Sequence, residues 1–200
     1  MCGSHRVGKT TLARAVAPTL HLPVIESRAG EVCRELGIDM AADLSLHERI
    51  GVQEMILDAA IDDYKRHAGS FISDRTPLDM AAYILADCLK NSGTAEEQRA
   101  AVAYVERCID VTNKNFTCLI LVKPGIPYVV EADKPPPSVA YQEHHGMLVQ
   151  GLVNDLRVLP ECYEIARRAL ALEERTQIVL DIWSDLSTTA QKNLKHVTCH

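Results

Sequence analysis

The sequence contains no long apolar run, since none of its hydrophobic stretches approaches the roughly 18 residues that a transmembrane helix needs. It also does not open with the charged, apolar and small-residue segments of a secretion signal. Neither membrane insertion nor secretion is indicated. We therefore expect a cytoplasmic protein with no membrane partner.

The cysteines do not form the pattern of a disulfide framework or of a zinc site. Seven of them are scattered along the 200 residues without a C-x-x-C pair, and their number is odd. We expect most of them to be small core residues. The pair His144–His145 is predicted to lie on a solvated helix face, because adjacent helical residues point apart and do not converge on a metal ion.

An excess of positive charge is also absent. The formal net charge is −6 and the isoelectric point is about 5.7, which disfavours a broad nucleic-acid-binding surface. The chain is 47% apolar and 24% charged, which is ordinary for one globular domain of 200 residues. Small molecules are therefore the expected substrates.

The most informative feature is residues 3–10, GSHRVGKT, which form a complete G-x-x-x-x-G-K-[ST] phosphate-binding loop. In such a loop the backbone N–H groups point at phosphate oxygens, Lys9 bridges the outer phosphates and the Thr10 hydroxyl can bind Mg²⁺. The following helix adds its positive N-terminal end. The predicted nucleotide-binding residues are Gly3, Ser4, His5, Arg6, Val7, Gly8, Lys9, Thr10 and Thr11.

The strand that normally precedes such a loop is missing or very short, because only Met1 and Cys2 stand before Gly3. Two explanations stay open. Either residues upstream of Met1 complete the strand in the native protein, which we favour, or a stub of two residues serves in its place.

Apolar periodicity beyond the loop predicts alternating strands and helices, and hence an α/β fold with a mostly parallel sheet covered by helices on both faces. Residues 1–200 are expected to form one domain. The predicted strands are residues 22–26, 70–74, 116–122 and 156–159, and the predicted helices begin at Thr11 and cover about 28–36, 46–67, 76–90, 94–113, 138–156 and 161–183. Arg175 is placed on the polar side of the last helix.

Charged side chains follow two of these strands at the sheet edge where such folds bind ligands. Glu26 ends the predicted strand at 22–26, and Asp74 ends the next one, with Arg75 directly after it. Phosphoryl transfer requires cations around a spreading negative charge and a carboxylate that orients the attacking oxygen. Glu26, Asp74 and Arg75 are therefore candidate catalytic residues together with Lys9, and Thr10 and Asp74 are candidate Mg²⁺ ligands.

These segments resemble the P-loop nucleoside and nucleotide kinase superfamily, particularly small kinases related to thymidylate kinase and to the ribosylnicotinamide kinase domain. The resemblance rests on the loop, on residues 26–28, on residues 74–79 (DRTPLD) and on the region after Val122. It implies a three-layer P-loop NTPase sandwich, ATP and Mg²⁺ as cofactors, and transfer of phosphate to a nucleoside or nucleotide. It also implies that Arg75 grips the acceptor, that Asp74 positions it or assists Mg²⁺, and that Glu26 contacts an acceptor hydroxyl.

The resemblance further implies a lid, for which residues 123–145 are the candidate. Five of the nine prolines lie between residues 123 and 137. Nucleotide kinase lids usually carry arginines over the transferred phosphate, but no Arg occurs between Arg107 and Arg157. Lys123 and Lys134 are the lid cations, and Lys134 is the candidate phosphate contact, although it lacks the bidentate fork of Arg.

Other NTPase classes fit less well. Asp74 does not begin a D-x-x-G motif and residues 113–116 (NKNF) lack the final Asp of N-K-x-D, which disfavours a GTPase. Motor and remodelling ATPases usually place a Glu after the strand-end Asp, where this chain has Arg75. Two rivals stay open: a kinase that acts on a modified base or an end within DNA, and a non-catalytic ATP-binding or ATPase regulatory module.

Overall fold

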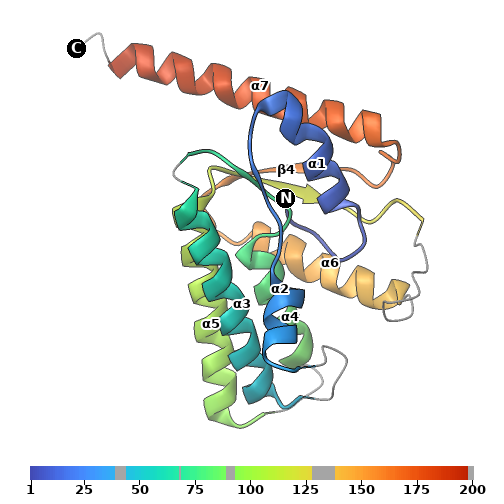
Figure 1. The fold of residues 1–200 in the computed structure, drawn as a ribbon, viewed down its shortest axis with the longest axis vertical. Coiled ribbons are helices and arrows are strands. Elements are labelled where there is room, and N and C mark those ends of the chain that lie inside the picture. The colour runs from blue at the N-terminus through green and yellow to red at the C-terminus, as the bar shows by residue number, and fades with distance from the viewer. Residues whose placement is uncertain (39–43, 68, 89–92, 128–137, 198–200) are drawn as a thin grey trace.

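The computed structural model of the chain describes residues 1–38, 44–67, 69–88, 93–127 and 138–197. Helices and strands alternate along the chain, as predicted for an α/β fold (Figure 1). The elements are α1 Lys9–Leu20, β1 Val24–Ile25, α2 Ala29–Glu35, α3 Leu46–Arg66, β2 Ile72–Ser73, α4 Pro77–Cys88, α5 Ala95–Asn115, β3 Cys118–Val122, α6 Val139–Val153, β4 Glu161–Ile165 and α7 Leu172–Val197.

The strands pair in parallel, as the sequence predicts. Strand β1 pairs with β2, and β3 pairs with β4 from Cys118 opposite Glu161 to Val122 opposite Ile165. Residues 1–2 lie between these two pairs. Cys2 forms a parallel bridge with Leu121, and its N–H donates to the Ile120 carbonyl at 2.9 Å, while the Met1 ammonium donates to the Ser73 carbonyl at 2.6 Å. The short segment before the phosphate loop thus joins β2 to β3.

Side chains on β3 alternate between two apolar clusters, because successive residues of a strand point to opposite faces. Leu119 and Leu121 pack in a cluster with apolar residues of α3, α4 and α5, whereas Ile120 and Val122 pack in a second cluster with residues of α1 and α7. Helices α1 and α7 accordingly lie on one side of the strands and α3 to α6 on the other (Figure 1). Apolar burial on both faces holds the carboxyl ends of the strands in place beneath the loop.

Reciprocal capping boxes begin the two longest helices of the second side. The Ser45 hydroxyl accepts from the Glu48 N–H while the Glu48 carboxylate accepts from the Ser45 N–H, and Thr94 and Glu97 repeat the arrangement at α5. Each box satisfies two backbone N–H groups that a helix start otherwise leaves unpaired. These helices begin within one residue of the predicted positions.

The predicted last strand and last helix are wrong in position. Residues 156–159 form no strand: α6 ends at Val153, the Val158 N–H donates to the Asp155 carbonyl in a turn, and Leu156 is 98% exposed. The strand β4 instead begins at Glu161, where a helix was predicted, and α7 begins at Leu172. The Asp155 carboxylate accepts from the Arg157 N–H and stabilises the turn. The apolar residues around Asp155 therefore do not adopt the extended conformation of a strand.

Part of the predicted lid, residues 128–137 with Lys134, lies outside the described residues. Of the rest of that region, residues 139–145 belong to α6. Among the described helices, none combines the length and apolar character needed to cross a membrane.

Candidate functional site

The phosphate loop requires glycine at both ends of its motif. Gly3 has a φ of 137°, and a Cβ atom there would lie 2.4 Å from the Val122 carbonyl oxygen. Gly8 has a φ of 81° and directly precedes α1. Both angles lie in the region that side-chain-bearing residues rarely adopt. The loop is therefore folded tightly against the end of β3, with the N-terminus of α1 following it.

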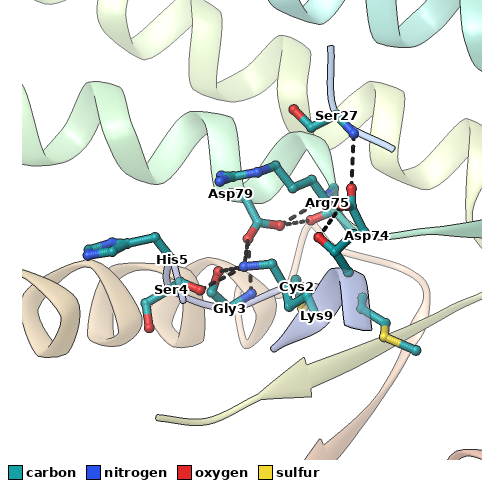
Figure 2. Close-up of polar contacts among 12 residues, drawn as sticks. Cys2, Gly3, Ser4, His5, Lys9, Ser27, Asp74, Arg75 and Asp79 are labelled. Atoms are coloured by element: carbon teal, nitrogen blue, oxygen red, sulfur yellow. Dashed lines mark hydrogen bonds and ion pairs between the residues drawn. The ribbon is translucent and has the colours of Figure 1, made fainter. Parts of the chain in front are cut away.

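Lys9 lies inside the loop with its side chain only 6% exposed. Its Nζ donates to the carbonyls of Gly3 at 2.5 Å and Ser4 at 2.7 Å, and lies 3.5 Å from Oδ1 of Asp79 (Figure 2). Burial lowers the pKa of Lys9, while the Asp79 carboxylate opposes that shift. The ammonium group is thus desolvated and held where the loop folds around it.

Asp79 is a second partner of the loop, and it was not among the predicted site residues. Its side chain is fully buried, and it accepts from the Gly3 N–H at 3.0 Å and from both the N–H and the hydroxyl of Thr76 at 2.9 Å. Burial opposes ionisation, but Lys9, Arg75 and the Thr76 N–H hold the pKa of Asp79 below its usual value. The T-x-x-D spacing of residues 76–79, a helix-capping pattern, is the signal that could have identified this residue.

The two candidate Mg²⁺ ligands lie in contact. The Thr10 hydroxyl donates to Oδ2 of Asp74 at 2.5 Å. Oδ1 of Asp74 accepts from the Ser27 N–H at 3.0 Å (Figure 2). Asp74 is 5% exposed at the end of β2. A hydroxyl and a carboxylate are oxygen ligands of the kind that Mg²⁺ uses beside nucleotide phosphates. No group of three or more His, Cys, Asp or Glu side chains that could hold a metal by themselves occurs in the described part of the chain.

Arg75 and Glu26 lie in different settings. The Arg75 guanidinium is 5.7 Å from the centre of the Tyr83 ring, and its Nη1 donates to the Tyr83 hydroxyl at 3.3 Å. Glu26 forms an exposed bidentate pair with Arg14 of α1, at 2.6 and 2.7 Å. The hydrogen bond from Arg14 lowers the pKa of Glu26. Arg75 thus lies beside the loop, whereas Glu26 is engaged at its outer edge.

His145 is fully buried, so the prediction of a solvated face is wrong for this residue. Its ring lies 4.2 Å from that of Tyr83 and 6.4 Å from that of His5, and neither ring nitrogen has a hydrogen-bond partner among the described residues. Burial, with Lys9 and Arg75 nearby, lowers the pKa of His145 to about 4 although Asp79 opposes the shift. The His5 pKa is also lowered to about 4, chiefly by burial. Both rings are therefore neutral near pH 7.

Arg175 is also not on the polar side of its helix, as predicted, but 4% exposed against the loop. Its Nη2 donates to the Val7 carbonyl at 2.8 Å. Helix α7 begins at Leu172, eleven residues later than predicted, and the face that carries Arg175 packs on the loop instead of facing solvent. Lys123 of the predicted lid pairs with Glu164 at 2.9 Å.

Two comparisons with known proteins bear on the site. A protein-family model described as an AAA domain matches residues 1–114, which include the phosphate loop, Asp74, Arg75 and Asp79. No curated protein matches the sequence.

Proposed function

The chain belongs to this AAA domain family, a P-loop NTPase type, and from that premise we propose that it is an ATP-dependent phosphotransferase that acts on a nucleoside or nucleotide. Family membership supports nucleotide binding with hydrolysis or kinase-like activity and leaves the acceptor open. The choice of transfer over hydrolysis rests on the residues around Thr10.

One observation carries the proposal: the carboxylate that contacts Thr10 is followed by an arginine. Asp74 accepts from Thr10 and from the Ser27 N–H. Arg75 lies beside it and, among the described residues, donates to the neutral Tyr83 hydroxyl. An arginine next to the reacting phosphate binds an anionic acceptor, whereas an acidic residue there activates water. This arrangement favours an acceptor other than water.

The proposed reaction forms a bond between the acceptor oxygen and the γ-phosphorus and breaks the bond from that phosphorus to the β–γ bridging oxygen, so that ADP leaves. Where the acceptor is a hydroxyl, the carboxylate that orients it takes its proton. Lys9 neutralises charge on the β and γ phosphates. Thr10 and Asp74 would hold Mg²⁺, which when bound neutralises phosphate charge. Arg75 anchors the acceptor, and Asp74 or Glu26 orients its attacking oxygen. Lys134 of the predicted lid is proposed to add a further cation.

The experiment is incubation with γ-labelled ATP and Mg²⁺ and a panel of nucleosides, nucleoside monophosphates and short DNAs, followed by identification of the labelled product. A labelled small molecule supports the proposal, and labelled DNA supports the first rival. Release of free phosphate alone, or binding without any product, contradicts phosphotransfer and leaves an ATPase or a binding module.

One variant and its control test the site in this assay. Lys9→Ala should abolish transfer, because it removes the buried cation of the loop, with an expected loss on the order of 10²-fold or more. Arg168→Ala is the matched control, since Arg168 is exposed and lies outside the loop. Equal rates in Lys9→Ala and the unmodified protein would contradict the assignment of the site.

A further inference from the structure

Arg175 is a buried cation with no anionic partner in the described residues. Its side chain is 4% exposed, Nη2 donates to the neutral carbonyl of Val7, and Nε has no hydrogen-bond partner within the described part of the chain. No carboxylate among those residues lies within ion-pair distance of it. A buried charge is costly unless it is paired, because burial removes its hydration. Such a residue indicates a counter-ion that arrives with a ligand.

The position of Arg175 shows where that counter-ion would bind. The residue lies in the first turn of α7, which packs beside α1 (Figure 1). Its Nη1 is 3.0 Å from the point that a Cβ atom of Gly8 would occupy. Gly8 and Lys9 form the junction between the loop and α1, whose backbone N–H groups receive phosphates in loops of this type. The guanidinium therefore lies against the phosphate-binding end of the loop.

Four other cations near the loop have acidic partners. These pairs are Lys9 with Asp79, Arg14 with Glu26, Lys123 with Glu164 and Arg167 with Glu143. Arg175 differs from all of them in that no carboxylate among the described residues pairs with it, and its hydrogen bond goes to a neutral carbonyl. A guanidinium retains its charge when buried, and its planar donors match two phosphate oxygens at once.

We propose that Arg175 binds the phosphates of the nucleoside triphosphate and so supplies from α7 the arginine that the predicted lid lacks. This inference rests on the proposed nucleotide binding and adds a binding residue to that site. Arg175 lies outside the residues that match the family model, which end at residue 114. Through Arg175, helix α7 thereby contacts the phosphates of the nucleotide bound at the loop.

The test is calorimetric titration of the full chain with AMP-PNP and Mg²⁺, because this analogue reports binding without turnover. Arg175→Met, which keeps an unbranched side chain but no charge, should raise the Kd for AMP-PNP about tenfold or more, since it removes a charge-assisted contact. Arg175→Lys should give an intermediate Kd. Arg168→Met, an exposed neighbour, should bind like the unmodified chain.

The thermal midpoint without nucleotide separates ligand binding from a structural clamp. If phosphate is the counter-ion, Arg175→Met should leave the midpoint of the free protein unchanged or higher, because an uncompensated charge is removed. A lower midpoint with an unchanged Kd for AMP-PNP would overturn the inference and leave Arg175 as a clamp on Val7.

The same titration distinguishes failure of this inference from failure of the proposed function. If the unmodified chain does not bind AMP-PNP, both fail. If it binds and Arg175→Met and Arg175→Lys bind equally well, only the inference fails. Should Arg175→Met not fold, Arg175→Lys and hydrogen exchange of the unmodified chain still decide, because AMP-PNP should slow exchange at Val7 and in the first turn of α7.

Discussion

The Thr10 hydroxyl lies 2.5 Å from Oδ2 of Asp74, which joins the end of the phosphate loop to a carboxylate 64 residues further along the chain. Two features of the fold produce this contact. The loop follows Cys2, which bridges to β3 in parallel, and Asp74 follows β2. The Ser27 N–H, from the segment after β1, holds the other oxygen of Asp74. Three segments therefore fix the geometry of the proposed Mg²⁺ ligands.

Thr10→Ala should raise the Mg²⁺ concentration needed for half-maximal AMP-PNP binding by about tenfold or more, because it removes one oxygen ligand and the donor that orients Asp74. Thr10→Ser keeps the hydroxyl and should bind Mg²⁺ nearly as the unmodified chain does. The measurement is AMP-PNP binding across a Mg²⁺ series. An unchanged Mg²⁺ midpoint in Thr10→Ala would contradict the proposed ligand pair.

Gly3→Ala should destabilise the fold by several kcal/mol, because the new Cβ would lie 2.4 Å from the Val122 carbonyl oxygen and Gly3 has a φ of 137°. Gly51→Ala is the matched control. Gly51 lies within α3 with no neighbouring atom within 4 Å of an added Cβ, so alanine there should stabilise by up to about 1 kcal/mol. Chemical denaturation of both variants measures the difference, and equal effects would refute the steric argument.

The residues that local patterns could identify are those at motif positions and strand ends. The phosphate loop is a fixed motif, and the carboxyl ends of parallel strands meet at one sheet edge, so Thr10 and Asp74 could be predicted to lie together. The starts of the helices capped by Ser45 and Thr94 were predictable because their capping boxes are local. Local sequence patterns thus predict the loop, the strand-end carboxylate and the starts of these helices.

Residues whose roles depend on long-range packing could not be predicted in this way. Arg175 contacts Val7 across 168 residues, and nothing in the sequence of its own helix marks the face that packs on the loop. The burial of His145 likewise depends on how α6 packs on α4, near Tyr83. Because the turn at Asp155 takes the place of the predicted strand, β4 and α7 begin later in the chain than predicted. The polar pattern alone did not predict that shift.

The free energy of unfolding should fall as the pH is lowered from about 6.5 to about 4, because His145 has a pKa of about 4 in the fold and about 6.5 when unfolded. In that window the unfolded chain binds a proton that the folded chain does not. The loss expected from His145 is about 3 kcal/mol. Asp79 acts in a separate window, because its pKa is lowered in the fold, and its contribution is lost only as the pH falls below about 3.8.

His145→Phe should flatten this dependence without loss of stability at pH 7, since neither ring nitrogen of His145 has a hydrogen-bond partner among the described residues. His5, whose pKa is also lowered to about 4, should leave a residual slope of its own. Denaturant unfolding between pH 7 and pH 4.5 measures the effect, with the exposed His47→Gln as the control. An unchanged slope in His145→Phe would show that His145 is not the buried group that titrates.

Arg75→Ala should raise the KM for the phosphate acceptor by roughly 10- to 100-fold, or lower kcat, while the Kd for AMP-PNP changes less than about twofold. The reason is that Arg75 lies beside Asp74 and Tyr83 and not within the loop that binds the triphosphate. Arg75→Lys should recover part of the loss, because it restores charge but not the bidentate fork.

Tyr83→Phe is the matched control for Arg75, because it removes the hydroxyl to which Arg75 donates and leaves a ring beneath the guanidinium. Its effect on the acceptor KM should be smaller than about tenfold, as for a single neutral hydrogen bond. The two variants together separate anchoring of the acceptor from positioning of Arg75. If Arg75→Ala weakened AMP-PNP binding as much as it weakened use of the acceptor, Arg75 would belong to the triphosphate site, and the reason for preferring transfer over hydrolysis would no longer hold.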